Sequence, residues 1–234
     1  MKFSRGLAAL ILILFTHVNL LADYLYKDEV IHNPQFRADV NTLGSELFQK
    51  TGISLKLVML RELPNKMHIV EYEKELMKDF KEPTILLTFS ELDSKVDIFA
   101  SDKSLYKYFN KKQILSPVAS PIQSLIMALI YSKSFESFKE MATDYGGTIL
   151  PLLADKAKKG ELLGKYSGSM YNGYDDIAEQ IATAKGIKLE HAAGNANKNT
   201  FFVLKIVFYG FIIYGIFLYL KRKYYIKRHK NEFE

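Results

Sequence analysis

Apolar residues in the first half of the chain recur first at helical and then at strand spacing. Asn33 and Pro34 are favourable residues for the start of a helix, and one helical face is then marked by Phe36, Val40, Leu43 and Leu47. Gly52 is a typical helix end, and the short apolar run of residues 53–60 indicates a buried strand. The pattern therefore predicts a helix followed by a strand.

The same order repeats over residues 69–90. A second helical face is marked by Ile69, Tyr72, Leu76 and Phe80, and Pro83 ends it before the strand-like residues 84–90. The polar turn of residues 91–95 leads into another strand at residues 96–101, which predicts an antiparallel hairpin. We therefore expect an α/β fold, a small mixed sheet sandwiched between helices.

The pattern changes after Pro117 and Pro121. Residues 122–131 predict a strongly apolar helix, and a further helix is expected near residues 135–145. Residues 156–200 predict a separate juxtamembrane segment, irregular at first because of its spaced glycines and then helical over residues 175–185. This last helix could pack on the preceding domain or dock a partner close to a bilayer.

Both ends of the chain predict a membrane protein. Residues 201–220 contain a single charge, Lys205, and as a helix they are long enough to cross a hydrocarbon core of ~30 Å. The basic tail of residues 221–234 then predicts a cytoplasmic carboxyl terminus. Residues 1–22 are typical of a secretory signal, cleaved after Ala22. We expect a single-pass protein of the bacterial inner membrane with its folded domain in the periplasm.

Charge and composition narrow the classes of function. The signal and the tail together account for the whole formal net charge of +6, so the exported part is not basic and nucleic-acid binding is not expected. The absence of cysteine excludes disulfides and thiolate chemistry. The sequence has no HExxH, GxSxG, Walker A or GxGxxG motif, although an enzyme with dispersed catalytic residues remains open.

Three segments of residues 25–155 resemble the TPM domain family, which has a Rossmann-like fold. They are KDEVIHNPQFRADVNTLGSELFQKTGISLKLVML, PTILLTFSELDSKVDIFAS and SKSFESFKEMATDYGG. Bacterial members commonly carry a signal peptide before the domain and a transmembrane helix after it. The resemblance implies a TPM-like periplasmic domain over residues 23–155.

The family resemblance also implies two alternative functions. Family members are associated with acid phosphatase activity and divalent-metal binding, and with accessory roles beside membrane-protein complexes. The family's glycines after the hairpin are replaced here by Ala100 and Ser101, which disfavours close backbone approach to a ligand. We therefore expect a non-catalytic accessory module for a membrane-protein complex; the alternative is a weak divalent-metal-dependent acid phosphatase.

Acidic residues near the predicted strand ends are the candidate metal ligands. They are Asp28, Glu91, Asp93, Asp97 and Asp102. Carboxylates suit calcium or another hard divalent cation, and the candidate set is Asp93, Asp102 and Asp28. The alternative is that these acidic residues are simply solvated turn residues. Asp97 lies inside a predicted strand, and we interpret its side chain as pointing outward.

Overall fold

The computed structural model describes residues 23–158, 160–193 and 196–228 of the 234-residue chain. The predicted signal peptide of residues 1–22 lies outside the described residues. The chain divides into two units, Met1–Gly194 and Asn195–Glu234, and each is described by itself.

The first unit contains a four-stranded mixed sheet with the order β1-β2-β3-β4. The strands are β1 (Leu25–Asp28), β2 (Ser54–Leu60), β3 (Thr84–Ser90) and β4 (Lys95–Ala100). The first three are parallel, and β4 pairs with β3 in antiparallel register. The mixed sheet and the hairpin of its last two strands are therefore confirmed, whereas β1 was not predicted.

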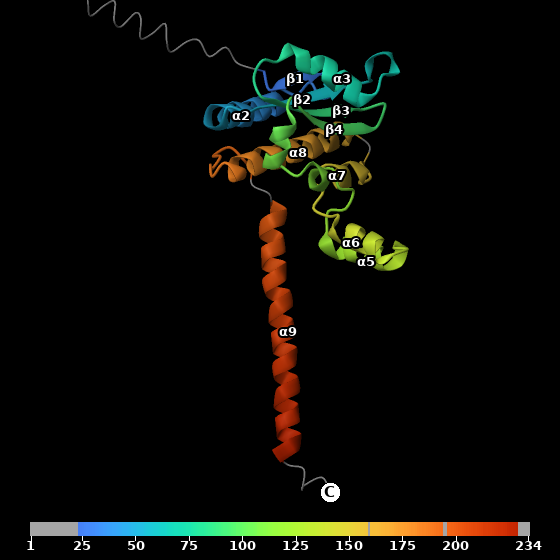
Figure 1. The fold of residues 1–234 in the computed structure, drawn as a ribbon, viewed down its shortest axis with the longest axis vertical. Coiled ribbons are helices and arrows are strands. Elements are labelled where there is room, and N and C mark those ends of the chain that lie inside the picture. Colours follow the sequence, from blue (N-terminus) through green and yellow to red (C-terminus); the bar gives the residue numbers. More distant parts are fainter. Residues whose placement is uncertain (1–22, 159, 194–195, 229–234) are drawn as a thin grey trace, which may run out of the picture. The chain divides into compact units, whose positions relative to one another are not determined.

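Helices cover both faces of this sheet (Figure 1). Helix α2 (Pro34–Thr51) and helix α8 (Leu162–Ala184) pack on one face, and helix α3 (Ile69–Leu76) packs on the other. As predicted, Asn33 caps α2 by accepting the Gln35 N–H at 2.8 Å, and Gly52 ends it in the left-handed region with φ 71°. The result is a three-layer α/β/α sandwich.

Two apolar layers hold the sandwich together. The larger one, between the sheet and α2 and α8, includes Leu43, Leu57 and Leu87. The smaller one, under α3, is formed by Val58, Leu60, Leu63, Ile69 and Leu86. All residues of β2 and β3 are buried, which agrees with the continuous apolar runs in their sequences.

Shorter elements connect these layers. They are η1 (Pro64–Lys66), η2 (Met77–Asp79), η3 (Lys103–Tyr108), α4 (Lys111–Ile114), α5 (Pro121–Tyr131), α6 (Phe135–Thr143) and α7 (Leu150–Ala154). Helices α5 and α6, which were both expected from the sequence, pack together as a hairpin (Figure 1). Two backbone hydrogen bonds close the base of this hairpin. The Gly147 N–H donates to the Val118 carbonyl at 3.0 Å, and the Thr148 N–H donates to the Ile114 carbonyl at 3.2 Å.

Helix α8 differs most from the sequence expectation. It begins at Leu162 and belongs to the sandwich, whereas the sequence placed an irregular segment here, apart from a domain ending at residue 155. Gly173 lies so close to Ile149 that an added Cβ would clash with its side chain. Tyr174 is fully buried, and its hydroxyl donates to the Leu55 carbonyl at 2.8 Å. These tertiary contacts outweigh the low helix propensity of the glycines.

The second unit is a single helix, α9 (Ala196–Arg228). Its described side chains from Ile206 to Leu220 include many large apolar ones, all exposed within this structure. The segment predicted to span the membrane, residues 201–220, lies inside this helix. Across the part of the chain that the structure describes, no helix reaches the length and apolarity required to cross a bilayer.

Candidate functional site

The three parallel strands end at one edge of the sheet, next to the start of α8. Tyr166 in the first turns of α8 packs against Phe89 near the end of β3, with 5.1 Å between ring centroids. At the other end of α8, Lys185 donates to the carbonyl of Thr51, which precedes β2. Open α/β sheets bind ligands outside the carboxyl ends of their strands, so this edge is the first place to look for a site.

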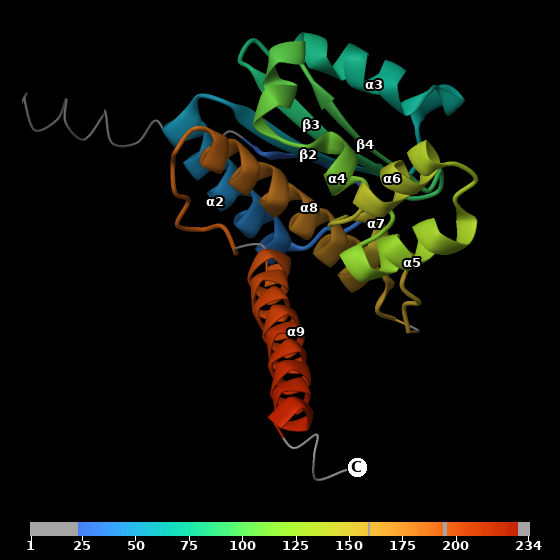
Figure 2. The same ribbon diagram turned by 60° about the horizontal axis from the view of Figure 1, so that its bottom comes forward.

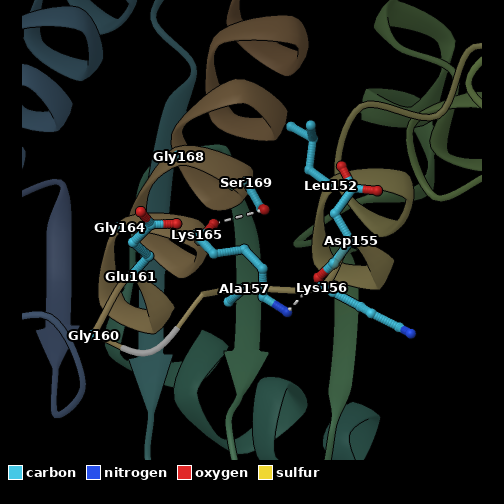
Figure 3. Close-up of a pocket in the computed structure, with 10 residues that line it drawn as sticks. All are labelled: Leu152, Asp155, Lys156, Ala157, Gly160, Glu161, Gly164, Lys165, Gly168 and Ser169. Atoms are coloured by element: carbon cyan, nitrogen blue, oxygen red, sulfur yellow. Dashed lines mark hydrogen bonds between the residues drawn. The ribbon is translucent and has the colours of Figure 1, made fainter.

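Two adjoining hollows lie at this edge, and we call them together the carboxyl-edge crevice. The first, of about 410 Å³, is lined by the β3–β4 turn, α7 and α8, with Glu91, Ser94 and Tyr166 among its residues. The second, of about 610 Å³, lies between α7 and the start of α8 (Figure 3). Lys165 lines both hollows.

Lys165 joins the two helices that border the crevice. Its Nζ donates to the carbonyl oxygens of Leu153 at 2.9 Å and Asp155 at 3.2 Å. An ammonium group has three N–H donors, so one remains for a bound acceptor. Figure 3 shows the Lys165 side chain extending from α8 toward Asp155 across the hollow.

The floor of the larger hollow is formed by glycines. An added Cβ at Gly164 or Gly168 would meet no atom within 4 Å, so both positions face open space. Gly160, in the turn before α8, has φ +88°, which favours glycine. The chain at Gly160, Gly164 and Gly168 therefore leaves space that a ligand or a peptide segment can enter.

The crevice carries charges of both signs. Glu91, Asp155 and Glu161 line it together with Lys156 and Lys165. Burial raises the pKa of Tyr166, and the negative charge of Glu91 raises it further. The Tyr166 hydroxyl therefore stays protonated at neutral pH and can donate a hydrogen bond.

Asp28 and Asp93, two of the predicted metal ligands, lie at the same carboxyl edge. Asp28 ends β1, and its carboxylate accepts the backbone N–H groups of residues 30, 31 and 32 at 3.2, 2.8 and 2.9 Å. Asp93 accepts the Ser90 hydroxyl at 2.6 Å and the Leu63 N–H at 2.8 Å. The Ser90 hydroxyl, followed by the Leu63 amide, holds the pKa of Asp93 below its usual value. Both carboxylates thus stabilise loops.

Asp102, the third predicted ligand, lies at the opposite edge of the sheet. It follows β4, whose Ala100 pairs with Ile85 at the start of β3. Its carboxylate caps η3 by accepting the Ser104 N–H at 2.7 Å, and Ser104 lowers the pKa of Asp102. The structure therefore brings Asp28 and Asp93 to one edge and leaves Asp102 apart. Among the described residues, no group of three or more His, Asp or Glu side chains is placed to share a metal ion.

Glu73 and Asp97 form a buried acidic pair that the sequence analysis missed. The outward orientation expected for Asp97 is wrong: only 9% of it is exposed, and its carboxylate pairs with Lys111 Nζ at 2.6 Å. Glu73 on α3 is fully buried, and its carboxylate has no hydrogen-bond partner among the described residues. Burial, and then the charge of Asp97, raises the pKa of Glu73 to about 8. The position of Glu73, four residues after the apolar Ile69, was the signal that could have revealed its burial.

Comparisons with known proteins add no family assignment. No protein-family model matches the chain, and a search of curated proteins finds no relative. The TPM resemblance therefore remains a prediction from the sequence.

Glu73 predicts that the folded state becomes less stable as pH rises. Its pKa is about 8 in the fold, against an ordinary value of 4.5, so the fold favours the protonated form. The protonated Glu73 therefore contributes its full stabilisation to the fold below about pH 4.5. The free energy of unfolding then falls as the pH rises toward about 8, by up to roughly 1.4 kcal/mol per pH unit. Replacing Glu73 by Gln removes the titration, so the Glu73→Gln variant should lose most of this slope in urea unfolding followed by near-ultraviolet circular dichroism.

The matched control is Glu75→Gln, because Glu75 is an exposed residue of the same helix. It should keep the parental dependence on pH. A parental slope that survives Glu73→Gln would contradict the assignment of this titration to Glu73.

Proposed function

We propose that this chain is a membrane-anchored interaction module without catalytic activity of its own. Residues 201–220 anchor it in the bacterial inner membrane, the α/β unit lies in the periplasm, and the basic tail lies in the cytoplasm. The carboxyl-edge crevice binds a segment of a membrane-protein complex. The observation that carries this proposal is the short connection between the folded unit and the apolar segment.

Leu189 is the last buried apolar residue of the α/β unit, and only residues 190–200 separate it from Phe201. A chain of this length reaches at most ~40 Å when fully extended. An anchor at residues 201–220 would therefore keep the α/β unit close to the bilayer surface. Its nearest binding partners would be the exposed parts of other membrane proteins.

Glu46 holds the segment that leads out of the α/β unit. Its carboxylate accepts the backbone N–H groups of Glu190 at 2.6 Å and His191 at 2.9 Å, and it pairs with Lys50 at 2.7 Å. Burial alone would raise the pKa of Glu46, but the bonds from Lys50 and from these amides lower it to about 2. The carboxylate is thus ionised at neutral pH and holds the connecting segment against α2.

The geometry of the crevice favours binding over hydrolysis. Asp28 and Asp93 already accept backbone amides in their own loops, and Asp102 lies at the other edge. The open glycine floor and the remaining donor of Lys165 suit an extended peptide segment, whose carbonyl groups would accept hydrogen bonds.

Filling the crevice tests this proposal. Gly164→Leu places a side chain in open space on α8, and it removes a glycine that costs a helix up to ~1 kcal/mol. The variant should therefore fold at least as well as the parent chain. We expect it to recover on the order of tenfold less partner, equivalent to ~1.4 kcal/mol, in cross-linking and affinity purification from membranes quantified by mass spectrometry.

The control for this test is Ala184→Leu. Ala184 is an exposed residue at the far end of the same helix, so this variant adds an equal side chain away from the crevice. Equal partner recovery by both variants would contradict binding in the crevice. Failure of the parent chain to recover any partner reproducibly would contradict the interaction role itself.

The alternative function is a weak acid phosphatase that depends on calcium or another divalent metal. The observation that favours it is the position of Asp28 and Asp93, at the same edge as Lys165. It predicts metal-stimulated hydrolysis of a phosphate ester that falls about a hundredfold in Asp93→Asn and survives in Asp102→Asn, at the other edge. The interaction module predicts no metal-stimulated hydrolysis by the parent chain.

A further inference from the structure

Helix α5 buries its small side chains and exposes its large apolar ones. Ser124 and Ala128 are buried, and the Ser124 hydroxyl donates to the Met141 carbonyl in α6. The exposed fractions of its aliphatic side chains are 66% for Ile122, 45% for Leu125, 50% for Ile126, 67% for Leu129 and 66% for Ile130. An amphipathic helix on a soluble domain normally has the reverse arrangement, and contiguous exposed apolar patches mark interaction surfaces.

These five residues lie on one face of α5, at positions i, i+3, i+4, i+7 and i+8. We call them the aliphatic face. No charged residue occurs between Pro121 and Ser132. At eleven residues, α5 is ~16 Å long, which is too short to cross a bilayer and suits a helix lying in the plane of a membrane surface.

The composition of the aliphatic face suits lipid better than protein. The centres of protein interfaces are enriched in aromatic residues, methionine and arginine, whereas this face consists of isoleucine and leucine. Tyr131 and Lys133, both exposed, follow it directly in the sequence. Tyrosine and lysine place apolar atoms toward lipid and polar ends at the headgroups.

The hairpin can reach a surface without disturbing the sandwich. It projects from the sheet and its covering helices in Figure 1, and α5 packs mainly against α6. Figure 2 shows α5 at the margin of the α/β unit, away from α2 and α3. An anchor at residues 201–220 would hold Leu189, the last buried apolar residue of the unit, within ~40 Å of the lipid, so this inference rests on the proposed function.

We propose that the aliphatic face of α5 inserts into the surface of the bilayer that residues 201–220 anchor. The side chains of the aliphatic face enter the boundary between headgroups and acyl chains, and Lys133 stays among the headgroups. The α/β unit is thereby attached to the membrane at two points. Two attachments restrict its rotation and keep the carboxyl-edge crevice in one orientation relative to the bilayer.

A single indole tests this insertion, because the chain contains no tryptophan. Leu129→Trp places the reporter on the aliphatic face, and Leu92→Trp places a control at the exposed turn between β3 and β4, where Leu92 is 61% exposed. Each full-length variant is reconstituted into phospholipid vesicles with and without brominated acyl chains. We expect blue-shifted emission and at least about twofold stronger quenching for Leu129→Trp than for the control.

A second substitution separates insertion from misfolding. Ile126→Glu, added to Leu129→Trp, places a charge on the aliphatic face and should abolish the excess quenching. Because Ile126 is already exposed, the circular dichroism spectrum should not change. The chain should still float with the vesicles, because residues 201–220 are intact.

Flotation and quenching distinguish failure of the anchor from failure of the insertion. A chain that floats while Leu129→Trp is quenched no more than the control overturns the insertion and leaves the anchor in place. Blue-shifted emission of Leu129→Trp without quenching by bromine also overturns the insertion. It would indicate instead that a protein surface, such as a second copy of this chain, covers α5. A chain that does not float contradicts both proposals, because either attachment would carry it to the vesicles.

Discussion

The hydrogen bond from the buried Tyr174 hydroxyl to the Leu55 carbonyl fixes α8 across the sheet. Tyr174 is fully buried, and burial raises its pKa well above 10, so the hydroxyl remains a donor. Gly44 on α2 makes this contact feasible, because a Cβ there would clash with the Tyr174 hydroxyl and with the Tyr24 side chain. A buried donor left without its acceptor costs about 1–3 kcal/mol. One small residue and one tyrosine thus set the distance between α2, α8 and the sheet.

The two ends of α8 have different roles once the helix is fixed. Its first turns border the carboxyl-edge crevice, where Gly164 and Gly168 form an open floor and Lys165 holds the end of α7. Its last turn leads to the segment that Glu46 binds, just before the chain leaves the α/β unit. The proposed binding surface and the start of the proposed tether therefore lie at the two ends of the same helix.

The sequence predicted those elements whose pattern is local. The run of apolar residues in β2 and the glycine that ends α2 require no knowledge of distant contacts. Helix α8 could not be predicted in full, because its glycines disfavour a helix locally and only the packing of Gly173 on Ile149 explains one of them. The site was predictable only in part. The predicted hairpin already implied that Asp93, in its turn, and Asp102, after its second strand, lie at opposite edges, and the choice of metal ligands overlooked this. Nothing in the sequence shows that Asp97 of β4 lies beside Glu73 of α3.

Membrane topology is the most direct test of a tethered module that presents its crevice outside the cytoplasm. The chain contains no cysteine, so Leu92→Cys in the α/β unit and Lys223→Cys in the tail each provide one label site for an impermeant maleimide. We expect both variants in the membrane fraction, with Leu92→Cys labelled in cells whose outer membrane alone is permeabilised and Lys223→Cys labelled only after the inner membrane is opened. Labelling of both sites at the first step, or recovery of the chain in the soluble fraction, would contradict the proposed arrangement.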